Sequence, residues 1–279
     1  MQPITTEIVS RTIIKRPAES HKGTYGRVLL IGGNQNFGGA IIMAAMAATY
    51  SGAGLVTVAT DPTNFMSLHA QLPEAMVIDY HQTDTLLNLL TGMDVVVIGP
   101  GLGTDPVADH LLSAVLAAVQ APQRLVIDGS ALTLLSQHAR TLPTTDIVVT
   151  PHQMEWQRLS GLAIEDQTPT ANHNAQQHLG VTAVVKAHRT TIYTNDQVWF
   201  NPGGTPAMAT GGMGDTLAGM IGGFVGQFTD FTDAILSAVY LHSAIADELA
   251  TTRYVVLPHQ ISPRIPTYMH RFSTRKPVD

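Results

Sequence analysis

The sequence predicts an α/β protein, a three-layer α/β/α sandwich built on a mostly parallel central sheet. Two observations support this. Short apolar runs rich in β-branched residues recur along the chain, and each ends in glycine, proline or a small polar residue. Because these runs are continuous rather than alternating in polarity, they are typical of strands covered on both faces. Segments with helical spacing lie between them, which favours βαβ units and a parallel sheet.

The elements follow one another along the first two thirds of the chain. The predicted strands cover residues 27–33, 55–60, 94–101, 124–129, 146–152 and 182–187. The predicted helices between them cover residues 40–50, 106–119, 131–138, 153–160 and 171–179. The helix at 40–50 is apolar almost all round, so we expect it to be buried in the core or against another subunit.

The pattern changes after residue 187. The runs TTIYTN and QVWFNPG flank Asp196 and predict a hairpin with an Asn-Asp turn, and hence an antiparallel edge to the sheet. Two long helices are expected next, at about 215–227 and 231–250. The tail from Pro258 carries four prolines and is expected to be extended or partly mobile. With no internal repeat and no linker, residues 1–279 are predicted to form a single domain.

The composition excludes several functional classes. Only 13% of the 279 residues are charged, the formal net charge is −6, and no long basic run suggests nucleic acid or a membrane surface as a partner. The uncharged span 28–60 is broken by glycine-rich stretches into pieces too short to cross a bilayer. The polar N-terminus is not a signal peptide, and the absence of cysteine fits a cytoplasmic protein.

Unusual residues gather where strands are predicted to end, which is where open α/β sheets bind ligands. The turn GGNQNFGGA (32–40) imitates a phosphate-binding loop but lacks its lysine, which argues against a P-loop enzyme. The backbone amides of residues 38–40 either hold an anionic or polar group at a helix start or form a plain turn. The glycines of GPGLGTD (99–105) indicate that a ligand or a neighbouring strand lies close to the backbone there. The stretch does not match the dinucleotide-binding fingerprint.

Three further stretches carry side chains able to do chemistry. In TPHQMEW, His152 and Glu155 are three residues apart and lie on one face if a helix begins there. Either both are site residues, or His152 is only a turn residue and Glu155 only satisfies free backbone N–H groups at the helix start. Lys186 ends an apolar strand, where a cation suits a phosphate, or else it is a surface lysine. In TGGMGD, Asp215 is either a helix cap or a base beside glycine amides that hold a transferring phosphate.

Taken together and in order, several stretches resemble one known family. They are GTYGRVLLIGGNQNFGGA, SGAGLVTVAT, VVVIGPGLG, VTPHQMEWQRL, NPGGTPAMATGGMGDTLAGMIGG and AVYLHSAIAD. The chain resembles the ADP- or ATP-dependent NAD(P)H-hydrate dehydratases of the ribokinase-like superfamily, over about residues 23–250. The resemblance implies repair of the 6-hydroxy hydrate of NADH or NADPH. A kinase-like step phosphorylates the hydroxyl and phosphate then leaves; members of the bacterial type convert ADP to AMP and phosphate.

The resemblance also implies roles for particular residues. Ala40, Gly103, His152 and Asp215 would contact the hydrated nicotinamide nucleotide, with Asp215 as the base. Glu155 would organise Mg²⁺, through water. The adenine nucleotide would be held by Lys186, Ala187, His188, Arg189, Thr190 and Gly214. Family members tend to form tetramers, so a homo-oligomer is expected. With no epimerase domain before residue 23, a separate protein is expected to interconvert the two hydrate epimers.

The chain departs from the family pattern at three places. KAHRT (186–190) stands where Lys-Gly-Ala-Gly-Thr is usual, GMGD (212–215) replaces Gly-Thr-Gly-Asp, and DGSALT (128–133) replaces Asp-Ala-Asp-Ala-Leu-Asn. These leave the donor, ADP or ATP, open. Two alternatives remain: a kinase of a small alcohol such as a thiazole or a hydroxymethylpyrimidine on the same fold, and a nucleotide-binding homologue without catalysis.

Overall fold

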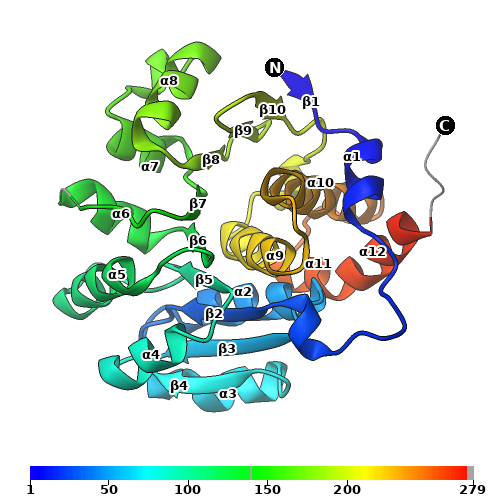
Figure 1. Ribbon diagram of the computed structural model, residues 1–279. Coiled ribbons are helices and arrows are strands. Elements are labelled where there is room, and N and C mark those ends of the chain that lie inside the picture. The colour runs from blue at the N-terminus through cyan, green and yellow to red at the C-terminus, as the bar shows by residue number, and fades with distance from the viewer. Residues whose placement is uncertain (139, 275–279) are drawn as a thin grey trace.

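The computed structural model describes residues 1–138 and 140–274, which form one sheet between two layers of helices (Figure 1). Among the described residues the strand order is β1-β10-β9-β8-β7-β6-β5-β2-β3-β4. The strands are β1 (Gln2–Pro3), β2 (Arg27–Ile31), β3 (Leu55–Thr60), β4 (Met76–Asp79), β5 (Val95–Ile98), β6 (Arg124–Ile127), β7 (Asp146–Val149), β8 (Thr182–Val185), β9 (Thr191–Tyr193) and β10 (Val198–Phe200). Neighbouring strands are parallel except where β9 meets β8 and β10. The mostly parallel sheet is therefore confirmed.

The helices divide between the two faces of the sheet, as Figure 1 shows. One layer contains α4 (Thr83–Leu90), α5 (Pro106–Ala118), α6 (Ser130–Gln137), α7 (Gln153–Ser160) and α8 (Pro169–Leu179). The other contains α1 (Thr6–Thr12), α2 (Gly38–Tyr50), α3 (Phe65–Gln71), α9 (Met213–Gln227), α10 (Phe231–Ala250), α11 (Pro258–Ile261) and α12 (Ile265–Ser273). Successive residues of β2 point into separate cores: Val28 and Leu30 into one, Leu29 and Ile31 into the other. Burial on both faces explains the continuous apolar runs.

Helix α2 lies inside the second layer and packs directly on α9. Its buried residues include Ile41, Ala44 and Ala48. A Cβ atom added to Gly219 of α9 would overlap the carbonyl oxygen of Ala44, so the two backbones lie closer than any larger residue would allow. The sheet and α9 together cover the buried face of α2, while Ile42, Met43 and Met46 stay partly exposed.

Two expectations about the elements are wrong, and one open alternative is decided. The hairpin β9–β10 is not the edge of the sheet, because β1 pairs with β10 and lies outermost. The tail is helical from Pro258 onwards, since proline occupies first-turn positions that need no backbone donor; residues 275–279 lie outside the described part. Helix α9 begins at Met213, with Gly212 as its N-cap residue at φ 93°, so Asp215 is not the cap.

Candidate active site

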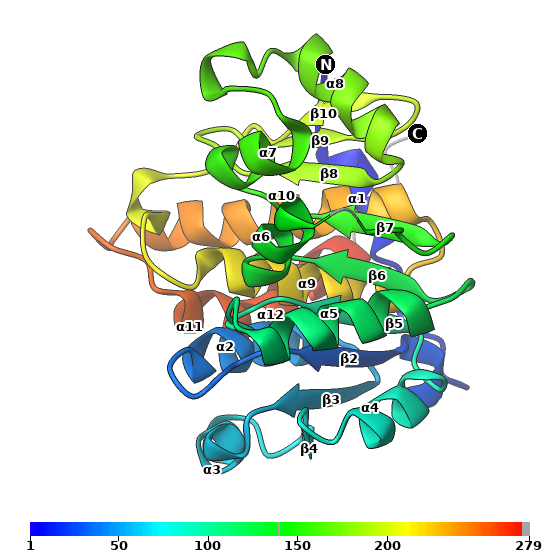
Figure 2. The same cartoon turned by 90° about the vertical axis from the view of Figure 1, so that its left-hand side faces the viewer.

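The site forms at the carboxyl ends of five neighbouring strands. In the sheet, β8, β7, β6, β5 and β2 are consecutive, so the segments that follow them meet along one edge. The arrows of β2, β3 and β6 point to the same side in Figure 2. The segments after β7 and β8 are tied together by a bridge between His152 and Lys186, and the Lys186 amide donates to the Pro151 carbonyl at 2.8 Å. The predicted convergence of the strand ends is confirmed.

Lys186 and Asp128 form a buried ion pair at the centre of this edge. Lys186 Nζ lies 2.9 Å from Asp128 Oδ1, and the Thr150 hydroxyl donates to the same oxygen at 2.6 Å. Burial alone would lower the pKa of the Lys186 ammonium, but the nearby carboxylates of Asp128, Glu155 and Asp215 outweigh it, so that pKa is raised. Lys186 therefore stays charged, and the alternative that it is a surface lysine is excluded because its side chain is only 22% exposed.

Asp215 stands in the first turn of α9, directly beside this ion pair. A Cβ atom on the preceding Gly214 would lie 3.0 Å from Lys186 Nζ, so glycine leaves room for the ammonium under the helix start. Burial raises the pKa of Asp215 to about 6; the negative charge of Asp128 also raises it, against the opposing effect of Lys186. A carboxylate with this pKa is ionised at neutral pH yet basic enough to accept a proton.

His152 and Glu155 meet at the start of α7, as their spacing predicts. His152 is the N-cap residue: its Nδ1 accepts from the Met154 and Glu155 amides at 3.1 and 3.2 Å, and Glu155 Oε2 accepts from the His152 amide at 2.8 Å. The capping role is thus real for both residues. It also orients His152, because an accepting Nδ1 leaves the proton of the neutral ring on Nε2, which belongs to a half-exposed side chain.

Ala40 and Gly103 lie on the other side of the edge, where α2 begins. The loop after β5 packs on this helix start: a Cβ on Gly101 would lie 3.0 Å from Ala40 Cβ, and one on Gly103 would lie 2.5 Å from Asn34 Nδ2. One expectation needs correction. The Ala40 amide is not free for a ligand, because it donates to the Phe37 carbonyl at 3.1 Å within the first turn.

A cavity of about 400 Å³ opens beside Lys186 and the start of α9. Its walls include five of the six residues expected to hold the adenine nucleotide: Lys186, Ala187, His188, Thr190 and Gly214. Arg189 does not line this cavity and is exposed. The opposite wall comes from the loop 203–209 and from His242 and Ser243 of α10. The structure therefore joins a cavity to a buried lysine, glycine amides and a basic carboxylate.

Comparison with known proteins gives the family. Residues 28–267 match the sequence model of the NAD(P)H-hydrate dehydratases. The chain belongs to the NAD(P)H-hydrate dehydratase family. It is 87% identical to an ADP-dependent (S)-NAD(P)H-hydrate dehydratase of Lactiplantibacillus plantarum, over 98% of both chains.

Two solved structures have the same fold as this chain. A ribokinase-like superfamily protein of Enterococcus faecalis has 52% identity and a TM-score of 0.96, covering 99% of this chain and 97% of that one. An ADP/ATP-dependent NAD(P)H-hydrate dehydratase of Bacillus subtilis, crystallised with ATP and Mg²⁺, has 30% identity and a TM-score of 0.86, covering 97% and 98%. The expected ribokinase-like fold is confirmed. In the described part of this dehydratase-family chain, no helix has both the length and the apolarity to span a membrane.

Sequence reasoning missed two residues of this dehydratase-family site. Asp128 stands out in the sequence only as part of a departure from the family pattern, although it ends a predicted strand, as Lys186 does. His242 escapes notice there, because a histidine inside an apolar helix gives no distinct signal. In the structure it is 5% exposed, and burial together with Lys186 lowers its pKa to about 4. His242 is therefore neutral near pH 7.

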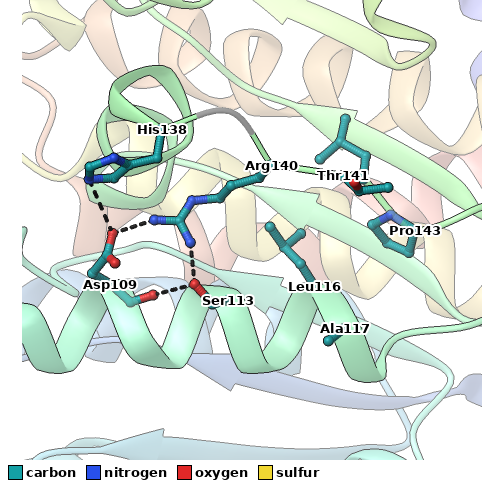
Figure 3. Close-up of a pocket in the computed structure, with 9 residues that line it drawn as sticks. Asp109, Ser113, Leu116, Ala117, His138, Arg140, Thr141 and Pro143 are labelled. Atoms are coloured by element: carbon teal, nitrogen blue, oxygen red, sulfur yellow. Dashed lines mark hydrogen bonds and ion pairs between the residues drawn. The ribbon is translucent and has the colours of Figure 1, made fainter.

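A second cavity, of about 540 Å³, lies between α5 and the segment before β7, away from these residues. Figure 3 shows Arg140 in its wall, bonded to Asp109 and Ser113 of α5, with Leu116 and Pro143 further along. The guanidinium is already paired with a carboxylate, and none of the stretches that resemble the dehydratase family lines this cavity. Its larger size does not make it the better candidate, since it shares no lining residue with the cavity beside Lys186.

Proposed function

We propose that this chain regenerates NADH or NADPH from the (S) form of its 6-hydroxy hydrate, with ADP as the phosphoryl donor. The observation that carries the proposal is Asp215, a basic carboxylate at a glycine-rich helix start beside the buried ammonium of Lys186. The name of the Lactiplantibacillus plantarum relative, which specifies ADP and the (S) form, supports the choice of substrates.

The reaction has two stages in this proposal. Asp215 takes the proton of the 6-hydroxyl group of the hydrate. At the same time, the hydroxyl oxygen bonds to the terminal phosphorus of ADP, and AMP leaves. The ring-nitrogen lone pair then expels phosphate from the neighbouring carbon, and loss of the adjacent C–H proton restores the double bond. Lys186 and the first amides of α9 stabilise the charge on the transferring group.

The remaining site assignments are proposals of the same kind. Substrate contacts come from Ala40, Gly103 and His152, whose Nε2–H can donate to an oxygen of the nicotinamide nucleotide. The nucleotide is held along residues 186–190 and by Gly214, with Arg189 at the exposed end. The described residues contain no cluster of three side chains able to hold a metal directly. This fits a Mg²⁺ bound mainly by nucleotide phosphates, with Glu155 acting through water; bound there, it would neutralise phosphate charge.

We further propose that residues 1–279 act as one catalytic domain, in the cytoplasm, as a homotetramer. The Lactiplantibacillus plantarum relative is named for the (S) form alone. A separate epimerase would therefore supply the (S) form from the hydrate with the opposite configuration at the carbon that bears the hydroxyl group. Light scattering of the purified chain would show its oligomeric state directly.

One assay tests the function against its alternatives. The purified chain is incubated with NADH hydrate, Mg²⁺ and either ADP or ATP, and the return of reduced-nicotinamide absorbance is followed. We expect recovery with stoichiometric phosphate release, faster with ADP. Nucleotide turnover only with a small alcohol, such as a thiazole or a hydroxymethylpyrimidine, would instead identify a kinase. Binding of nucleotide without turnover would identify a homologue without catalysis.

The rate should fall on the acid side of pH 6. Asp215 must be ionised to accept the hydroxyl proton, and its pKa is raised to about 6. The fraction of active enzyme is therefore nearly constant at pH 7 and above. It decreases about tenfold per pH unit below the pKa. A profile of kcat/KM from pH 5 to 8 measures this limb. A flat profile down to pH 5 would contradict the assignment of Asp215 as the base.

A further inference from the structure

The Lys186 ammonium group interacts electrostatically with three carboxylates at the centre of the site. The charges of Asp128, Glu155 and Asp215 all act on Lys186. Among the described residues, Lys186 makes its one ion pair within 4.0 Å with Asp128, at 2.9 Å. The choice of partner matters for chemistry, since a carboxylate paired directly with a buried ammonium is a weaker base than an unpaired one. The structure leaves Asp215 unpaired.

Local structure explains why Asp128 holds the ammonium. Its backbone amide donates to the Ile98 carbonyl at 3.0 Å and fixes the residue at the end of β6. Its side chain is 3% exposed and receives the Thr150 hydroxyl on the same oxygen that binds Lys186. A carboxylate this deeply buried requires a cation close by, because removing the partner would leave an uncompensated charge. Asp215 is less buried than Asp128, and it directly follows Gly214, which lines the cavity.

We propose that Asp128 is a positioning residue that keeps the Lys186 ammonium on the β6 side, so that the Asp215 carboxylate stays unpaired and free to accept a proton. The effect on rate rests on the function proposed above. The ion-pair geometry itself does not depend on it.

The surrounding charges predict how the site responds when Asp128 loses its charge. Asp215 is influenced by Asp128, Lys186 and Glu155, and His242 on α10 is neutral. With Asp128 neutral, the remaining anionic partners of Lys186 are Glu155 and Asp215. Glu155 is already engaged by the His152 amide. Lys186 then moves to Asp215. This movement and the loss of the Asp128 charge both lower the pKa of Asp215, so the base becomes weaker.

The test is Asp128→Asn, which removes the charge and keeps the shape. The readout is a ¹³C NMR titration of the Asp215 carboxyl group in the ligand-free protein, assigned by its loss in Asp215→Asn. We expect the pKa of Asp215, about 6 in the parent chain, to fall by roughly one unit or more. In turnover, kcat should fall about tenfold or more, and the acid limb should move to lower pH. A merely structural residue would not move that limb.

Asp61→Asn is the matched control. Asp61 is also a buried carboxylate at a strand end, 4% exposed and hydrogen-bonded to Thr63 at 2.6 Å, but it follows β3. It should cost stability without shifting the pKa of Asp215. An unchanged or higher pKa for Asp215 in Asp128→Asn would overturn the proposal. So would an equal shift in Asp61→Asn.

Two further arms keep the test decisive. If Asp128→Asn fails to fold, Asp128→Ser, which leaves room for water beside Lys186, provides the same titration. If the pKa of Asp215 falls as expected but no variant or parent dehydrates NADH hydrate, the ion-pair proposal stands and the proposed function fails. If dehydration is observed and the pKa does not move, the reverse holds.

Discussion

Asp215→Asn is expected to abolish dehydration while nucleotide binding persists. Removing a general base typically costs a factor of about 10²–10⁴ in rate, and Asn cannot accept the hydroxyl proton. Nucleotide binding should remain, because the residues proposed to hold it, namely Lys186, the segment after it and Gly214, line the cavity and are unchanged in this variant. Turnover of NADH hydrate and calorimetric titration with ADP measure the two properties separately. A loss of kcat with little change in nucleotide affinity is the expected pattern.

The same substitution should make the folded protein more stable above pH 6. The pKa of Asp215 is 3.8 in the reference state and about 6 in the fold. Between these values the folded state binds more protons, so this carboxylate lowers the free energy of unfolding as pH rises from 4 to 6. Above pH 6 the full cost is present, on the order of 2–3 kcal/mol. Asn removes that cost, and Tm should rise by a few degrees at pH 7 and much less at pH 4.

Asp230→Asn is the control that shows how the same substitution acts at a helix cap. Asp230 is the N-cap residue of α10, where Oδ1 accepts from the Asp233 amide at 2.7 Å. Asn caps almost as well as Asp, so activity and stability should both change little. If Asp215→Asn also retained near-normal turnover, its carboxylate would not be the base.

The opposite directions expected for activity and stability of Asp215→Asn arise from where glycine places the residue. With Gly212 as its N-cap residue at φ 93°, α9 begins at Met213, two residues before the expected start, which places Asp215 inside the first turn. Inside the turn, the carboxylate is pressed towards Asp128 and Lys186, and that burial raises its pKa.

The sheet was predictable because its strands are buried on both faces. The runs that became β2, β3, β5, β6, β7 and β8 carry uninterrupted apolar residues, and their ends carry glycine or polar residues. Strand β4 was not identified, since it lies at the sheet edge and its residues Met76–Asp79 are partly exposed. Strand β1 has two residues and gives no periodic signal at all.

Local sequence motifs identified most of the site residues, but not those whose role depends on a contact with a residue distant in sequence. Lys186 and His152 follow predicted strands, Asp215 lies in a glycine-rich stretch, and all three were identified. Asp128 has the same kind of position, but its importance comes from a hydrogen bond to Lys186, 58 residues away in sequence. No local pattern encodes that pairing. The Ala40 amide shows the converse: its position was correctly placed at a helix start, but the turn consumes its donor.

Gly219→Ala is expected to destabilise the fold strongly. The added methyl group would overlap the Ala44 carbonyl oxygen and lie 2.7 Å from its carbonyl carbon and 2.8 Å from its Cα. Backbone atoms cannot turn aside as a side chain can, so α9 must move away from α2. Overpacking of this kind costs about 3 kcal/mol, and Tm should fall by on the order of 5–10 °C. Because α9 carries Asp215 in its first turn, the displacement should also reduce kcat beyond what unfolding explains.

Gly226→Ala in the same helix shows that the effect is not one of glycine in general. There the added Cβ would meet Val95 Cγ2 at 3.4 Å and Val28 Cγ2 at 3.5 Å, which are ordinary contacts. Alanine favours the helix by up to about 1 kcal/mol, so this variant should be as stable as the parent or more so. Thermal unfolding of both variants at pH 7, with kcat measured well below either Tm, makes the comparison. Equal stability of the two would mean that α2 and α9 tolerate separation, and that the glycines of α9 serve the helix start alone.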